Sequence, residues 1–138
     1  MDWIPAIHAG MTMLNHLYNQ VTPRSSVGSI IFEGIDFNHD QDGIWWKVTT
    51  QLVAAWWPMV HSGSESNRTT PQSLASKYQG ELRKAQKLAP HQNGKGIVAT
   101  IRDKLTTGFD LPTGEPWYYF NRLHIGATAW FIFAEQPV

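Results

Sequence analysis

The sequence predicts a mainly α-helical protein in which about two helical hairpins are joined by long structured loops. Two segments, 44–60 and 118–136, carry apolar side chains around most of a helical circumference, whereas a third, 70–88, is apolar on one face only. A helix that is apolar nearly all round must be buried between other layers, and a one-sided helix keeps a solvated face. These three segments therefore indicate layered helical packing.

Length and charge restrict the kind of protein and its partners. The 138 residues fit one domain, and the eleven basic residues balance the eleven acidic ones, so no nucleic-acid partner is predicted. No apolar run approaches the roughly 20 residues that a membrane helix needs, so no membrane partner is expected. Because the sequence has no cysteine and no secretory signal, cytoplasmic localisation is the default expectation.

The chain is predicted to change character near residue 28. Residues 1–28 show no clean helical or strand period, so we expect an unrelated or poorly ordered leader that ends in a loop at 22–29. Residues 29–138 form the predicted domain. This domain opens on a β-prone run at 29–35.

A polar loop follows, with acidic or amide side chains at every second position: Asp36, Asn38, Asp40 and Asp42. It fits a calcium loop, the acidic rim of a sugar-binding cleft, or a solvated turn before a buried helix. The EF-hand pattern needs glycine at position six and glutamate at position twelve. Starting at Asn38 puts Thr49 at position twelve, and starting at Asp36 puts Gln41 at position six and Lys47 at position twelve. Neither register satisfies the pattern, so no metal site is predicted.

The apolar segment 44–60 is expected to form one buried helix. Positions eleven apart nearly superimpose at 100° per residue, which gives two aromatic stripes, formed by Trp45 with Trp56 and by Trp46 with Trp57. Pro58 is expected to end or kink this helix.

The remaining elements follow from their caps and composition. Thr70 fits the N-cap of the amphipathic helix, with Pro71 at its first helical position. Residues 96–117 are too rich in Gly, Pro and Thr for a helix and are expected to form a long structured connection. In the final apolar helix, His124 fits either a hydrogen-bonded core residue or a ligand contact. The sequence contains no zinc-type histidine spacing, P-loop or dinucleotide motif, so no cofactor is predicted.

Four stretches together resemble the C-terminal part of bacterial proteins in the six-hairpin glycosidase superfamily: DGIWWKVTTQLVAAW, LRKAQ, DKLTTGFD and YYFNRLHIGATAWFIFAEQ. This resemblance implies an (α/α)6 toroid around a carbohydrate-binding cleft. Residues 29–138 would then form a partial toroid, a truncated fragment of a carbohydrate-active enzyme. The oligosaccharide partner is an expectation from this resemblance.

The resemblance also suggests site residues. Such relatives tend to read W-x-E-G-T-x-Q where this chain has 45–51, and Lys47 stands in place of the glutamate. Glycoside hydrolysis commonly needs two carboxyl groups. The candidate catalytic residues are Asp36, Asp42 and Asp110, with Asp40 also on the rim, and the candidate substrate-binding residues are Trp45, Trp46, Tyr118, Tyr119 and His124.

Two functions therefore remain open. The first is a glycan-binding or glycan-hydrolysing fragment that is weakly active or inactive alone. The second is a non-enzymatic helical module that completes its core with a partner chain. The motivation for the second is the excess of apolar helix surface, which also predicts self-association through exposed helix faces.

Overall fold

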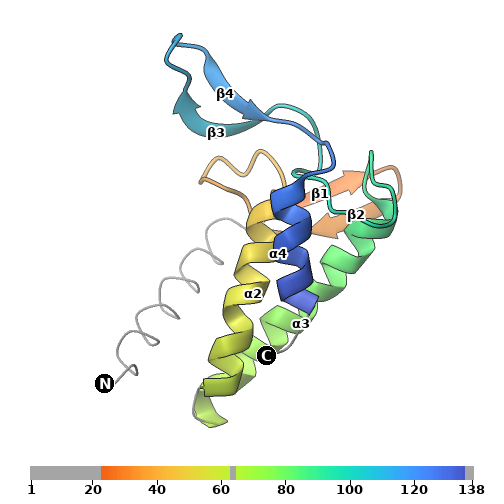
Figure 1. The fold of residues 1–138 in the computed structure, drawn as a ribbon, viewed down its shortest axis with the longest axis vertical. Coiled ribbons are helices and arrows are strands. Elements are labelled where there is room, and N and C mark those ends of the chain that lie inside the picture. Colours follow the sequence, from red (N-terminus) through yellow and green to blue (C-terminus); the bar gives the residue numbers. More distant parts are fainter. Residues whose placement is uncertain (1–22, 63–64, 136–138) are drawn as a thin grey trace.

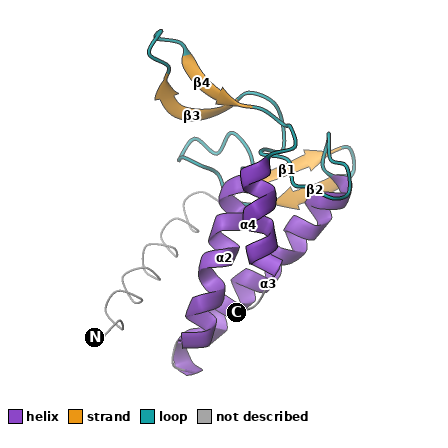
Figure 2. Cartoon of the chain, in the orientation of Figure 1, coloured by secondary structure: helices purple, strands orange, loops and turns teal. Residues whose placement is uncertain are grey.

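The computed structural model describes residues 23–62 and 65–135. These residues form three helices and two antiparallel hairpins (Figure 1). The helices are α2 (Trp46–Ser62), α3 (Glu65–Leu88) and α4 (Ile125–Glu135), and the strands are β1 (Arg24–Val27), β2 (Ile30–Glu33), β3 (Leu105–Asp110) and β4 (Pro116–Tyr119). Figure 2 shows both hairpins toward the same end of the helical layer. None of these helices is long and apolar enough to span a membrane.

The predicted mainly α-helical partial toroid is wrong, because the described residues form a small mixed α/β fold. One cause is the last predicted helix, which begins at Ile125 rather than at Tyr118. Tyr118 and Tyr119 lie instead in β4, where aromatic side chains are favoured. The second cause is that the long structured connection expected at 96–117 contains β3 and the start of β4, so it forms a hairpin.

The helix ends also differ from their predicted positions. The predicted helix in 44–60 is confirmed from Trp46 onward and continues past Pro58 to Ser62, whereas Trp45 precedes it and forms an isolated bridge with Thr100. The amphipathic helix begins at Glu65, so Thr70 is not its N-cap and Pro71 lies inside it. Its predicted apolar face is largely correct, because Tyr78, Leu82 and Ala85 are buried.

The core lies where α2 packs against α3 and α4. Its aromatic centre is Trp56, whose ring stacks on Tyr78 with 5.9 Å between centroids. α4 contributes two alanines and one large side chain to this core, namely Ala127, Ala134 and Phe131. The other large side chains of α4 are exposed, so the prediction that both apolar helices are buried between layers holds for α2 and is wrong for α4.

A buried extended segment, residues 97–101, ties the starts of α2 and α4 together. The Ile101 N–H donates to the carbonyl of Ile44 (2.9 Å), and the His124 N–H donates to the carbonyl of Ile97 (3.0 Å). These bonds satisfy backbone groups that would otherwise be buried without partners. The segment therefore fixes where both helices begin, beside the second hairpin.

The first hairpin packs on the end of α3. β1 pairs with β2 through a turn at Gly28, whose φ of +59° glycine adopts at little cost. The predicted β-prone run is confirmed as β2, whereas the predicted loop at 22–29 is wrong for Arg24–Val27. The N–H of Glu33 donates to Glu81 of α3 (3.0 Å). The remainder of the predicted leader, residues 1–22, lies outside the described residues.

Candidate functional site

The acidic loop, residues 36–43, docks against the base of the β3–β4 hairpin. Thr106 of β3 makes two of the contacts: its backbone N–H donates to Asp42 Oδ2 (2.7 Å) and its hydroxyl donates to Asp40 Oδ2. Close approach also requires Gly43, because a Cβ at that position would lie 2.8 Å from both methyl groups of Leu105. The loop and the hairpin therefore form one surface.

Three carboxylates of this loop meet. Asp36, Asp40 and Asp42 each place one oxygen within 4.8 Å of the others. Asp36 is only 1% exposed, and its Oδ1 accepts a hydrogen bond from the Phe37 N–H (2.6 Å). In contrast, Oδ2 of Asp36 and Oδ1 of Asp42 are buried and have no hydrogen-bond partner of normal geometry among the described residues, although the Gly43 N–H and the Asp40 carboxyl group approach the Asp36 carboxyl group. Asp110, the other candidate carboxylate, is exposed at the far end of β3 and does not belong to this cluster.

The environment separates the proton affinities of the three carboxyl groups. Burial raises the pKa of Asp36 to about 7, and the negative charges of Asp42 and Asp40 add to the rise. Burial also raises the pKa of Asp42. Burial acts in the same direction on Asp40, but hydrogen bonds from Thr106 and the Asp42 N–H outweigh it and lower the pKa of Asp40. The cluster is therefore suited to hold a proton or a cation.

An aromatic row starts at the acidic loop and crosses to the hairpin; it consists of Phe37, Trp45, Tyr119 and Trp117. Phe37 stacks on Trp45 (5.0 Å between centroids), Trp45 lies 4.7 Å from Tyr119, and Tyr119 lies 6.5 Å from Trp117. Trp45 is buried and supports the row, whereas Phe37 and Trp117 are each 47% exposed. The row thus offers two exposed rings on a packed base.

A shallow hollow of about 410 Å³ continues from Trp117 along the hairpin. Its lining is mostly apolar and aromatic: Leu111, Glu115, Pro116, Trp117, Tyr118 and Phe120. Glu115 is the acidic residue in this lining. The hollow therefore combines ring surface with an acidic residue, a composition typical of small-molecule sites.

Two further side chains flank Tyr119. Lys47 places its Nζ 6.0 Å from the centre of the Tyr119 ring, and the His124 ring lies 6.0 Å from it. Burial lowers the pKa of His124, and the positive charge of Lys47 lowers it further. The Nδ1 of His124 accepts a hydrogen bond from the Ala127 N–H (3.1 Å), so this histidine caps α4.

The predicted substrate-binding residues thus fall into two groups. Trp45, Tyr118, Tyr119 and His124 lie on or beside the aromatic row and hollow. Trp46 is completely buried and meets Phe32 edge to face (5.8 Å), so it has no surface for a ligand.

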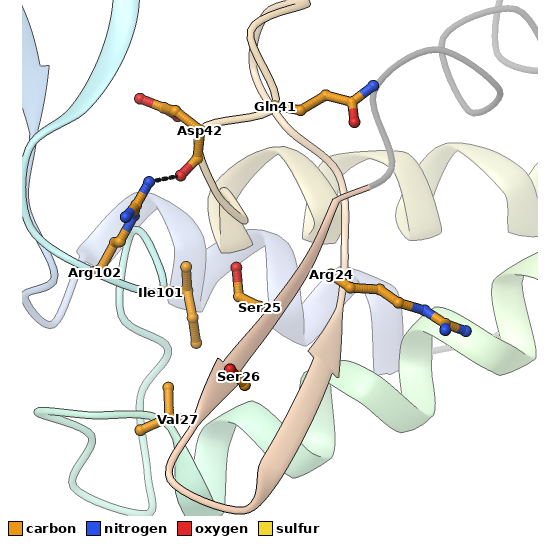
Figure 3. A pocket seen from close by; sticks show the side chains of 8 residues that line it. All are labelled: Arg24, Ser25, Ser26, Val27, Gln41, Asp42, Ile101 and Arg102. Carbon is orange, nitrogen blue, oxygen red and sulfur yellow. Dashed lines mark hydrogen bonds between the residues drawn. The ribbon is translucent and has the colours of Figure 1, made fainter.

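A polar pocket of about 340 Å³ lies on the other side of Asp42, between the acidic loop and β1 (Figure 3). Arg102 donates to the backbone carbonyl of Asp42 at one wall, and Ser25, Ser26 and Val27 of β1 lie opposite. Arg24 points away from the Arg102–Asp42 pair and forms an ion pair with Glu33. The Arg102 hydrogen bond therefore holds the acidic loop on this side.

Sequence reasoning missed Phe37, Thr106 and Trp117. A signal for Trp117 was present, because two β-prone runs flank a turn at Gly114, which has a φ of +83°. Nothing local indicates that Thr106 meets the acidic loop, because that contact spans more than sixty residues.

No protein-family model, curated protein or solved structure matches this chain.

Proposed function

We propose that this chain binds saccharides on the aromatic row and the adjoining hollow, and that it does not hydrolyse them. The observation that carries the proposal is the placement of Trp117, an exposed ring that belongs both to the row and to the hollow. The apolar C–H faces of sugar rings pack on aromatic rings, while their hydroxyl groups need polar neighbours at the rim. Glu115 in the hollow and the acidic loop beside Phe37 supply such neighbours.

The sequence motifs support the same ligand class. The resemblance to six-hairpin glycosidases includes DKLTTGFD and the start of YYFNRLHIGATAWFIFAEQ, which contain β3 and part of β4. Of the aromatic residues at the site, Tyr118, Tyr119 and Phe120 fall in the second stretch, whereas Trp117 lies between the two stretches. A surface that is exposed, apolar and aromatic is also the kind that marks a ligand-binding region on a small protein.

The arrangement of carboxylates argues against hydrolysis. A glycosidase commonly needs two carboxyl groups that flank the scissile bond. Asp36 is buried and has no access to a substrate, and Asp110 lies outside the acidic cluster. Lys47 stands where the resembled proteins carry glutamate, and an ammonium group does not replace a carboxylate in this chemistry.

The test is isothermal calorimetry of the full chain with a panel of soluble oligosaccharides. We expect saturable binding by the wild type and a dissociation constant at least about tenfold weaker for Trp117→Ala, since loss of a stacked ring costs on the order of 1.4 kcal/mol. Trp130→Ala is the matched control, because Trp130 is exposed on α4, away from the row.

Two results would contradict the proposal. The first concerns binding: either no saccharide gives saturable heat at millimolar concentration, or Trp130→Ala loses as much affinity as Trp117→Ala. The second concerns hydrolysis alone: release of the aryl group from aryl glycosides faster than in buffer would show that the chain is an enzyme.

A second function is favoured by a different surface. Ile125, Ile132 and Phe133 of α4 are exposed, and Ile125 is 91% exposed. We propose that this α4 surface, defined by these three residues, binds a second copy of the chain. The balanced charge favours this occupant, because two copies without net charge do not repel each other.

A further inference from the structure

Two buried oxygens of the acidic cluster lack the hydrogen-bond partners that buried carboxylates normally have. Oδ2 of Asp36 and Oδ1 of Asp42 accept no hydrogen bond among the described residues, and Asp36 is almost fully enclosed. Burial of an uncompensated negative charge is costly, so such a group is either protonated or neutralised by a cation. Three carboxylates around one point attract a cation as well as a proton, and carboxylate oxygens are the ligands by which proteins bind calcium.

We propose that Asp36, Asp40 and Asp42 bind a Ca²⁺ ion, with Oδ2 of Asp36 and Oδ1 of Asp42 as two of its ligands. The spacing fits this ion. Calcium binds oxygen at about 2.4 Å, so two ligands of one ion lie at most roughly 4.8 Å apart. The cluster offers one oxygen from each carboxylate within 4.8 Å of the others.

The donor set also distinguishes among metals. All three donors are carboxylate oxygens, which suit a hard cation, whereas zinc prefers histidine and cysteine. Magnesium demands near-ideal octahedral geometry at about 2.0 Å and keeps several waters. A site in which two buried oxygens lack hydrogen-bond partners among the described residues is better matched to calcium, which tolerates irregular coordination.

The backbone of the loop overcomes one of the two objections that the sequence raises. In the register that begins at Asp36, Gln41 occupies the sixth position, where calcium loops use glycine for its positive φ. Gln41 nevertheless has a φ of +53°, so the loop makes the required turn with a non-glycine residue. The other objection stands, because Lys47 replaces the bidentate glutamate. We therefore expect weak affinity, with a dissociation constant of roughly 10⁻⁴ to 10⁻³ M.

This inference goes beyond saccharide binding because it concerns a different ligand and different atoms. Its consequence for the fold is direct: Asp40 and Asp42 also accept hydrogen bonds from Thr106 of β3. A bound ion would fix these carboxylates and so stabilise the loop on the hairpin.

The experiment uses the full chain after treatment with EDTA. Calcium chloride is titrated by calorimetry, and thermal unfolding is followed with and without the ion. We expect saturable heat and a rise in the unfolding temperature for the wild type. Asp36→Asn should bind at least tenfold more weakly, whereas the matched control Asp103→Asn, an exposed residue outside the cluster, should bind like the wild type.

A separate measurement shows whether Asp36→Asn remains folded. In EDTA this variant should unfold at a temperature no lower than that of the wild type, because asparagine keeps the shape and removes a buried charge. The proposal is overturned by no heat and no stabilisation of the wild type at millimolar calcium, or by unchanged affinity in Asp36→Asn. Magnesium binding as tight as calcium binding would overturn the choice of ion.

Discussion

Thr106 donates its backbone N–H to Oδ2 of Asp42 over 2.7 Å, a contact between residues 64 positions apart in the sequence. The Thr106 hydroxyl also donates to Asp40. One residue of β3 therefore holds two carboxylates of the acidic loop, and the loop in turn carries Phe37, the first ring of the aromatic row. The position of the loop and that of the hairpin depend on each other.

Replacement of Thr106 by valine tests this link. Thr106→Val keeps the shape and the backbone N–H but removes the hydroxyl donor to Asp40, so the free energy of unfolding should fall by about 1 kcal/mol. Urea unfolding measures the change. Thr106→Ser retains the donor and should lose less. Equal losses in the two variants would show that the hydroxyl contact contributes nothing.

Two glycine substitutions should have opposite effects, because Gly43 lies against β3 and Gly80 faces open space. Gly43→Ala should lower the free energy of unfolding by about 1–3 kcal/mol, because the new methyl group would collide with Leu105. Gly80→Ala, in the exposed middle of α3, should raise it by roughly 0.5–1 kcal/mol, because no atom lies within 4 Å of the added Cβ. Chemical denaturation of both variants decides the matter. A neutral Gly43→Ala would contradict the tight approach of the loop.

His124 gives the fold a pH dependence. Its pKa is lowered by burial and by Lys47, so the unfolded chain takes up a proton more readily than the folded one. Stability that is present above about pH 6.5 should therefore be lost as the pH falls below that value. His124→Asn can still accept the Ala127 N–H bond and has no proton to gain.

The measurement for His124 is the difference in free energy of unfolding between the wild type and His124→Asn, at about pH 7.5 and about pH 5.5. Other titrating groups act similarly in both proteins and largely cancel. The free energy of unfolding of the wild type should fall further between the higher and the lower pH than that of His124→Asn does. A difference that does not change with pH would refute the assigned role of this histidine.

The α4 surface predicts association between copies. Sedimentation should show a mass that rises with concentration, and Ile132→Lys should abolish the rise by placing a charge in the apolar contact. Leu88→Lys is the control, because Leu88 is exposed at the end of α3 and outside this surface. A wild type that stays monomeric at all concentrations, or equal effects of both variants, would contradict self-association through α4.

Helical segments were predictable from the sequence where side-chain spacing alone decides the structure. The eleven-residue spacing of Trp46 and Trp57 lies within α2, and the repeat of Tyr78, Leu82 and Ala85 marks the buried face of α3. The strands were harder, because β1, β2 and β4 have only four residues each and show no sustained alternation. Exposure of α4 was not predictable either, since an apolar pattern does not reveal whether a neighbour covers it.

The individual residues of the site were predictable from the sequence, but the tertiary contacts that bring them together were not. Alternation places the acidic side chains of the loop, but it does not reveal that Asp36 is buried or that the loop lies against β3 through Gly43 and Thr106. Likewise, the aromatic residues at 117–119 are visible in the sequence, whereas their connection to Phe37 through Trp45 depends on distant segments. Contacts of this kind arise from tertiary packing, which local sequence patterns do not encode.

The central claim is that saccharides bind at Trp117, and the most direct measurement is nuclear magnetic resonance of the tryptophan indole N–H groups during titration with the tightest-binding oligosaccharide. The account predicts that the Trp117 resonance shifts progressively to saturation while that of Trp130, on α4, stays in place. A saturable shift at Trp130 without one at Trp117, or no shift at any indole, would contradict it.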